Sequence, residues 1–152
     1  MVILILANND VGLYKFRKEL LKKLLENNHL YISLPQGELI PKLIEMGCVY
    51  VETTMDRRGM NPIRDGKLVI AYARLIRRIK PDVIITYTIK PNIYGGMVAS
   101  FHKITYAVNI TGLGSAFQRE GVMKRLVVSF YKRTIKRAKA VFFENEENQK
   151  LF

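Results

Sequence analysis

The sequence of 152 residues lacks the features that assign a chain to several common protein classes. Its one cysteine, Cys48, lies in an apolar run, so a buried packing thiol and a reducing compartment fit best. No apolar run approaches the roughly 20 residues that span a bilayer. The first run, residues 2–7, is too short for a signal peptide and lacks its basic start. We therefore expect a cytoplasmic location, either free or peripheral on a membrane face.

The motifs of several ligand classes are also missing. There is no P-loop, and residues 8–12, Asn-Asn-Asp-Val-Gly, do not form a dinucleotide fingerprint after the first apolar run. The nearest glycine-rich string, residues 112–117, ends in Phe and comes late in the chain, which disfavours a nicotinamide or flavin enzyme. Zinc-finger and RNA-binding signatures are absent, so we expect no nucleic-acid partner. The two histidines are isolated, and we expect neither a metal nor another cofactor.

Acidic residues are few, since 13 aspartates and glutamates accompany 25 lysines and arginines and the net charge is +12. Residues 121–143 contain seven basic residues and no acidic one. On the helix predicted at residues 122–138, these charges lie mostly opposite an apolar stripe that includes Leu126 and Phe130. The charged side is either a solvated face or a contact with an anionic membrane surface. The residues expected to make this contact are Lys124, Arg125, Lys132, Lys136 and Lys139.

Short apolar runs alternate with amphipathic segments along the whole chain. The runs predict six strands, at residues 2–7, 30–34, 48–53, 83–87, 105–110 and 140–143. The segments between them predict helices at residues 15–27, 38–46, 65–80, 93–101 and 122–138. In the first helix, we expect a buried stripe that includes Phe16 and Leu20. This alternation predicts an α/β fold, namely a doubly wound, mainly parallel, six-stranded sheet of the Rossmann-like type.

Polar residues follow three of the predicted strands, where ligands bind in open α/β sheets. After the first strand, Asn8, Asn9 and Gly12 either contact a phosphate or sugar or form an ordinary turn with Asp10 near a helix cap. The hydroxyl, ammonium and amide groups after the fourth strand suit a sugar or phosphate, although two of them also suit a helix cap. The residues expected to line a cleft after the fourth and fifth strands are Thr88, Lys90, Asn92, Asn109, Thr111, Gly112 and Gly114.

The loop after the third predicted strand is polar and basic. Arg57 and Arg58 stand beside a glycine and precede the Asn61-Pro62 turn. Arginine forks bind phosphate and carboxylate groups well, so we add Arg57, Arg58 and Asn61 to the candidate cleft. The alternative is a solvated basic turn without a ligand.

Four strings together resemble the N-terminal half of family 4 retaining glycosyltransferases, particularly bacterial enzymes that build capsule, lipopolysaccharide and lipid-linked glycans. They are Leu-Tyr-x-Phe-Arg at residues 13–17, Asp-Arg-Arg-Gly-Met-Asn-Pro at 56–62, Thr-Tyr-Thr-Ile-Lys-Pro-Asn-Ile-Tyr-Gly at 86–95 and Asn-Ile-Thr-Gly-Leu-Gly-Ser-Ala-Phe at 109–117. The resemblance implies one half of a GT-B architecture, in which two Rossmann-like domains face each other across a cleft. In that architecture the N-terminal domain usually receives the acceptor, often a sugar on undecaprenyl diphosphate.

The donor half of such an enzyme usually binds the nucleotide sugar through a Glu-x7-Glu motif, which this sequence does not contain. The resemblance therefore implies that residues 1–152 form the acceptor-side domain, with the C-terminal donor-binding domain absent. The whole enzyme would transfer a hexosyl group without a metal, and this chain alone would be inactive or need a separate C-terminal half as partner. Two alternatives stay open: half of a nucleotide-sugar 2-epimerase, or a non-catalytic membrane-docking subunit of a two-part glycosyltransferase.

Overall fold

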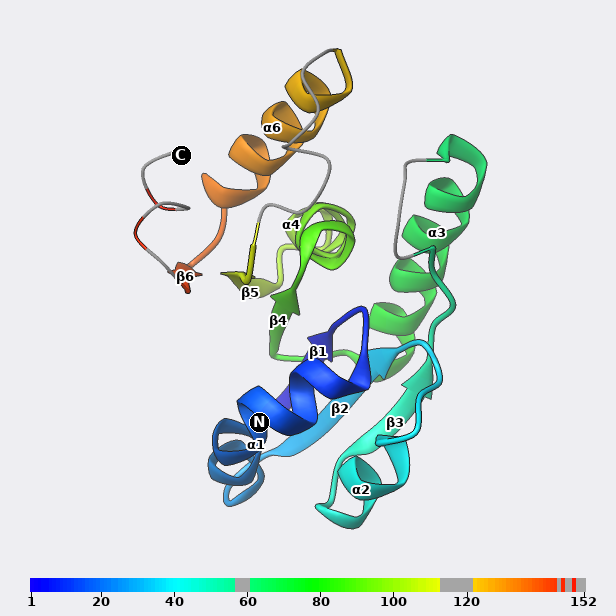
Figure 1. The fold of residues 1–152 in the computed structure, drawn as a ribbon, viewed down its shortest axis with the longest axis vertical. Helices are drawn as coiled ribbons and strands as arrows, with labels where there is room; N and C mark the ends of the chain where they lie inside the picture. The colour runs from blue at the N-terminus through cyan, green and yellow to red at the C-terminus, as the bar shows by residue number, and fades with distance from the viewer. Residues whose placement is uncertain (57–60, 113–121, 145, 147–148, 150–152) are drawn as a thin grey trace.

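One parallel sheet of six strands organises the chain (Figure 1). The computed structural model describes residues 1–56, 61–112, 122–144, 146 and 149. The strands are β1 Val2–Leu6, β2 His29–Leu34, β3 Val49–Glu52, β4 Val83–Tyr87, β5 Thr105–Ile110 and β6 Ala140–Phe143. Their order is β3-β2-β1-β4-β5-β6, and every adjacent pair is parallel. The predicted fold class is confirmed.

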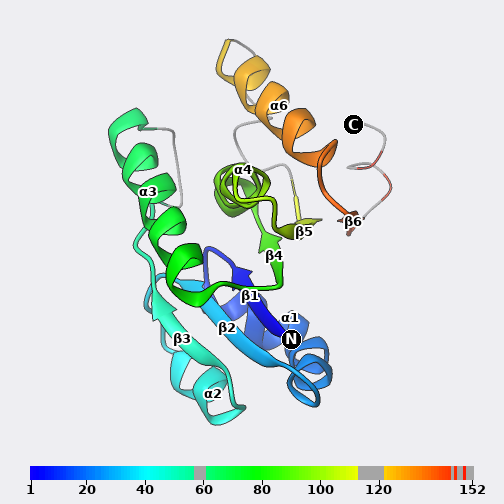
Figure 2. The same cartoon turned by 180° about the vertical axis from the view of Figure 1, so that it is seen from behind.

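Helices cover both faces of the sheet, as Figures 1 and 2 show from opposite sides. Helices α1 (Asp10–Leu25) and α2 (Ile40–Glu45) lie on one face. On the other face lie α3 (Pro62–Ile79), a turn of π-helix, η1 (Pro91–Gly95), and then α4 (Gly96–Phe101) and α6 (Val122–Ile135). The crossover connections therefore change face between β3 and β4, which makes the sheet doubly wound.

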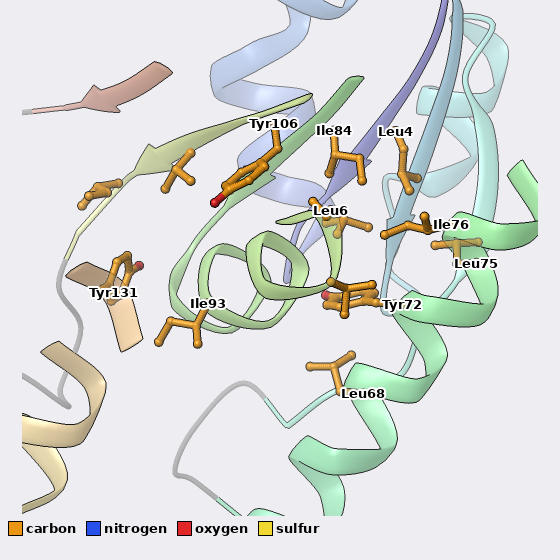
Figure 3. Close-up of a cluster of buried hydrophobic side chains, with 14 residues drawn as sticks. Leu4, Leu6, Leu68, Tyr72, Leu75, Ile76, Ile84, Ile93, Tyr106 and Tyr131 are labelled. Carbon is orange, nitrogen blue, oxygen red and sulfur yellow. The ribbon is translucent and has the colours of Figure 1, made fainter. Parts of the chain in front are cut away.

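Alternate residues of the central strands supply the two hydrophobic cores. In β1, Ile3 and Ile5 point to the side of α1 and α2, whereas Leu4 and Leu6 point to the side of α3 and α4. Figure 3 shows Leu4 and Leu6 in the same cluster as Tyr72 of α3, which is fully buried. Because both faces of β1 are buried, its sequence is continuously apolar and does not alternate with polar residues.

Two helices begin earlier than predicted because asparagine side chains cap them. Helix α1 begins at Asp10 and not at residue 15, and Oδ1 of Asn9 accepts a hydrogen bond from Gly12 N at 2.6 Å. Helix α3 begins at Pro62 and not at residue 65, with Oδ1 of Asn61 accepting from Ile63 N and Arg64 N. Proline suits the first helical position because its missing N–H would have no helical partner there. Helix α6 ends at Ile135, before the predicted residue 138.

The predicted buried stripe of α1 is partly wrong. Phe16 is 72% exposed and Leu20 is 42% exposed, whereas Leu13 and Leu21 are buried. Helix α1 packs against β2 through Leu13 and Leu21, and Phe16 and Leu20 lie on its exposed side. In α6, Leu126 and Phe130 of the predicted apolar stripe are exposed, whereas Tyr131 is buried. The amphipathic patterns predicted that these segments are helical, but they did not predict which side of each helix is buried.

Candidate functional site

The carboxyl ends of β1 and β4 lie side by side, with Leu6 of β1 opposite Thr86 of β4. From β1 the chain crosses to one face of the sheet, and from β4 it crosses to the other. Open α/β sheets bind ligands at such a switch point. The predicted residues after β1 and β4, together with Thr111 and Gly112 after β5, therefore follow strands at the edge of the sheet where a ligand site is expected.

The residues after β1 form a local hydrogen-bonded group. Asn9 caps α1 through Gly12 N, and its amide nitrogen donates to Oδ1 of Asn8 at 2.6 Å. The adjacent Asp10 is buried, and its carboxylate accepts from Val11 N and, across the β2–α2 loop, from Leu39 N at 2.7 Å. Gly12 thus lies in the first turn of α1, and its N–H is already engaged by Asn9. Within the described residues, none of these hydrogen bonds engages the side-chain amide nitrogen of Asn8.

Lys90 lies after β4 and is held by Asp65 of α3. Nζ of Lys90 lies 2.6 Å from Oδ1 of Asp65, and both side chains are about nine-tenths buried. The second carboxylate oxygen accepts from the Tyr94 hydroxyl at 3.0 Å and from Asn61 N at 3.2 Å. Burial, together with the negative charge of Asp65, raises the pKa of the Tyr94 hydroxyl. The structure therefore links the predicted site residues Lys90 and Asn61 through Asp65, whose role the sequence analysis missed.

Thr88 has an unusual backbone conformation at the end of β4. Its φ is +72°, in the left-handed region that β-branched residues rarely adopt. Its carbonyl oxygen accepts from Asn92 N at 2.9 Å, where η1 begins. The side-chain hydroxyl is buried and has no hydrogen-bond partner in the described part of the chain. Backbone strain of this kind is often found at functional sites.

Asn92, which we expected at the mouth of the site, is instead completely buried. Its amide nitrogen donates to the carbonyl oxygen of Asn109 at 2.8 Å and to the hydroxyl of Tyr131 at 3.1 Å. Asn109 in turn donates from its side chain to the carbonyl oxygen of Thr86 at 3.4 Å. Asn92 and Asn109 thus connect η1, β4, β5 and α6. The buried amide nitrogen of Asn92 gives the Asn109 carbonyl oxygen and the Tyr131 hydroxyl a hydrogen-bond partner, which explains why a polar residue lies at position 92.

The remaining predicted residues are placed as follows. Thr111 and Gly112 are half-buried after β5, and Gly112 has a φ of +153° that favours glycine. Arg57, Arg58 and Gly114 lie outside the described residues. Among the predicted membrane-contact residues, Arg125, Lys132, Lys136 and Lys139 are exposed, and the side chain of Lys124 is not described.

Arg17, in the first of the four strings, joins three elements. Its guanidinium carbon lies 5.6 Å from the centre of the Tyr87 ring, at the end of β4. It also forms an ion pair with Glu144, directly after β6. This contact spans 127 residues of sequence, which is why no local pattern reveals it.

The structure also has a pocket that the sequence analysis did not predict. It has a volume of about 340 Å³ and opens between the end of β3 and one side of α3. Its lining consists of residues 52–56 together with Arg64, Asp65, Lys67, Leu68 and Ala71. Asp65 therefore serves both the pocket and the buried pair with Lys90. In the described part of the chain, no group of three or more histidine, cysteine or acidic residues is placed to hold a metal ion.

Comparison with protein families gives a match along almost the whole chain. The model of the family described as glycosyl transferase 4-like matches residues 3–145. A Campylobacter jejuni protein, N,N'-diacetylbacillosaminyl-diphospho-undecaprenol alpha-1,3-N-acetylgalactosaminyltransferase, is 29% identical over 149 residues. The match covers 94% of this chain and 40% of that relative. The chain therefore spans well under half the length of this curated relative.

Solved structures share the fold. The UDP-GlcNAc 2-epimerase of Methanocaldococcus jannaschii superposes with a TM-score of 0.63 at 18% identity, over 96% of this chain and 40% of that one. MurG of Acinetobacter baumannii superposes with a TM-score of 0.64 at 13% identity, over 93% of this chain and 40% of that one. At these identities the likeness establishes the Rossmann-like architecture alone.

Proposed function

Because the chain belongs to the glycosyl transferase 4-like family, we propose that it is the acceptor-side half of a glycosyltransferase. This enzyme transfers a hexosyl group from a nucleotide sugar to a lipid-linked glycan in bacterial surface polysaccharide synthesis. The observation that carries the proposal is the similarity, over 94% of the chain, to a relative named for transfer to an undecaprenol-diphosphate-linked sugar. The nucleotide-sugar site would lie mainly in the part of such an enzyme that this chain does not match.

In this proposal, the chain contributes binding and orientation of the acceptor. The carboxyl edge of the sheet offers the Asn8 amide and the two remaining N–H donors of Lys90, which Asp65 holds in place. Groups fixed by buried partners lose little conformational entropy when a ligand binds, and this favours precise positioning. A fixed ammonium group also suits a phosphate or a hydroxyl oxygen of the acceptor.

The proposal is tested with the full-length enzyme that contains this domain and with the isolated chain. The enzyme, given a UDP-hexose panel and a short polyprenyl-diphosphate-linked sugar, should form an elongated glycan. The isolated chain should bind the polyprenyl-linked acceptor in calorimetry but should form no product. Transfer by the isolated chain would overturn the acceptor-side assignment. An epimerised nucleotide sugar, formed without acceptor, would instead identify a 2-epimerase.

We further propose that α6 contacts an anionic membrane surface, where a lipid-linked acceptor resides. No helix in the described part of the chain is long and apolar enough to cross a bilayer. The exposed Arg125 and Lys132 accompany the exposed apolar Leu126 and Phe130 on α6, and the exposed Lys136 follows directly after the helix ends. Exposed basic residues next to exposed apolar side chains suit an interfacial helix.

Vesicle flotation tests the membrane contact. Reversing Lys132, Lys136 and Lys139 to Glu should weaken binding to phosphatidylglycerol vesicles by about 1 kcal/mol per lysine, because each loses an attraction to anionic headgroups. The matched control reverses Lys15, Lys22 and Lys23, which are exposed on α1 and change the net charge equally. Equal losses in the two triple variants would show a general charge effect and no α6 contact.

A further inference from the structure

We propose that the pocket between β3 and α3 binds an uncharged sugar ring. This inference rests on the proposed function, because the ring would belong to the acceptor glycan. The pocket lies at the carboxyl edge of the sheet, directly after Glu52. It shares Asp65 with the Lys90 pair that follows β4, so it adjoins the switch point.

The size and shape of the pocket suit a small ligand. Its volume of about 340 Å³ is at the lower end of the range for small-molecule sites, roughly 300 to 1,000 Å³. Leu68 and Ala71 of α3 form an apolar side, and Met55 of the β3–α3 loop adds to it. Leu68 and Ala71 are spaced about one helical turn apart on α3, so their side chains make a continuous strip. One face of a sugar ring, or the methyl of an acetamido group, can pack on this strip.

The charge of the pocket disfavours a phosphate or a nucleotide. Its described lining contains three acidic residues and two basic ones, Arg64 and Lys67, although the chain as a whole carries a net charge of +12. The acidic residues are Glu52, Asp56 and Asp65. Asp65 is neutralised by Lys90, and Asp56 accepts two hydrogen bonds from Arg64 at 2.8 and 2.9 Å. With one carboxylate and one ammonium left, the described residues of the lining have almost no net charge. An uncharged, polar ligand is the class that such a lining favours.

The pocket retains free groups for hydrogen bonds to hydroxyls. The Thr53 hydroxyl is already bonded to Ser33 Oγ at 2.5 Å, whereas Thr54 is exposed. Glu52 and Lys67 are also exposed and have no ion-pair partner in the described part of the chain. A carboxylate accepts from a pair of sugar hydroxyls, and an ammonium donates to their oxygens. Glu52, Thr54 and Lys67 thus provide polar contacts around the apolar strip.

Nuclear magnetic resonance titration of the isotope-labelled chain tests the site directly. N-acetylglucosamine should shift the amide signals of residues 52–56 and 64–71 and bind in the millimolar range. Thr54→Val keeps the side-chain shape but removes the hydroxyl, and it should weaken binding about two- to tenfold. The matched control is Thr105→Val, an exposed threonine at the opposite end of the sheet, which should leave binding unchanged.

Charged probes distinguish the ligand classes. Glucuronate and UDP should bind to this pocket no more tightly than N-acetylglucosamine. Tighter binding of either anion, with shifts at residues 52–56, would overturn the proposal, as would shifts confined to other residues. Because the wild-type titration locates the site by itself, the conclusion does not depend on the folding of a variant.

Failure of the pocket proposal is distinguishable from failure of the proposed function. In the full-length enzyme, Thr54→Val should raise the KM for the acceptor and leave the KM for the nucleotide sugar unchanged. An active transferase with unchanged acceptor KM would refute the sugar pocket and keep the function. Absence of transfer with every acceptor would refute the function, while the titration would still decide the pocket.

Discussion

Asp65 of α3 and Lys90 form a buried ion pair that joins the start of α3 to the segment after β4. Their nearest charged atoms are 2.6 Å apart, and Asp65 also binds the hydroxyl of Tyr94. Isolated buried charges are costly, so the two groups depend on each other. The pair fixes η1 and α3 at the edge of the sheet where both candidate sites lie.

Removing one member of this pair should destabilise the fold strongly. Asp65→Ala should lower the free energy of unfolding by about 3 to 5 kcal/mol, because it leaves the Lys90 ammonium buried without its partner. The double variant Asp65→Leu with Lys90→Met should lose much less, since neither charge remains. Urea denaturation measures both. The exposed ion pair between Asp56 and Arg64 provides the control. Asp56→Ala should lower the free energy of unfolding by at most about 1 kcal/mol.

Because the backbone at Thr88 is strained, we expect a substitution by glycine there to stabilise the fold, which is unusual. Thr88→Gly should raise the free energy of unfolding by about 1 kcal/mol, because relief of left-handed strain outweighs the extra freedom of glycine in the unfolded chain. Thr86→Gly, two residues earlier in the extended backbone of β4, should be destabilising. If Thr88→Gly also weakens acceptor binding while stabilising the fold, the strain serves the site.

Two helical glycines should respond in opposite ways to the same substitution. A Cβ on Gly96 of α4 would lie 2.2 Å from the Thr134 methyl of α6, so Gly96→Ala should cost about 1 to 3 kcal/mol by overpacking. At Gly66 of α3, such a Cβ would meet no side chain or other element of the described chain within 4 Å, and Gly66→Ala should stabilise by up to about 1 kcal/mol. Thermal or urea unfolding of the two variants checks the pair. Similar stabilisation of both variants would show that α4 and α6 do not pack closely.

The buried thiol of Cys48 should affect stability only at high pH. Burial raises the pKa of this thiol from 9.0 to about 11. As the pH rises, the unfolded chain therefore loses its thiol proton first, and unfolding becomes more favourable. This part of the stability is complete below pH 9.0 and is lost as the pH rises toward about 11.

Comparison with Cys48→Ala isolates this contribution. The variant should show a shallower loss of stability over the same pH range in urea denaturation, because it has no thiol to ionise. At neutral pH, the native thiol should react with iodoacetamide far more slowly than the thiol of the denatured chain. Rapid labelling of the native protein would contradict the burial of Cys48.

The strand bounds that the sequence predicted agree closely with the structure, and β4, β5 and β6 match residue for residue. Strands buried on both faces are short apolar runs with polar boundaries, so local composition identifies them. Helix starts were less well predicted, because Asn9 and Asn61 extend α1 and α3 by capping them. Asparagine also occurs in turns, so its presence alone does not locate a cap.

By itself, the sequence determined the alternation of strands and helices, the doubly wound class and the edge at which ligands would bind. These follow from local periodicity and from the geometry of parallel strands. Only the tertiary structure decided what the polar residues at that edge do. It buried Asn92, paired Lys90 with Asp65 and opened a pocket, lined in part by Asp65, whose described residues are nearly neutral in sum. The reason is physical: hydrogen bonds and ion pairs between distant segments depend on packing, which no local pattern of residues encodes.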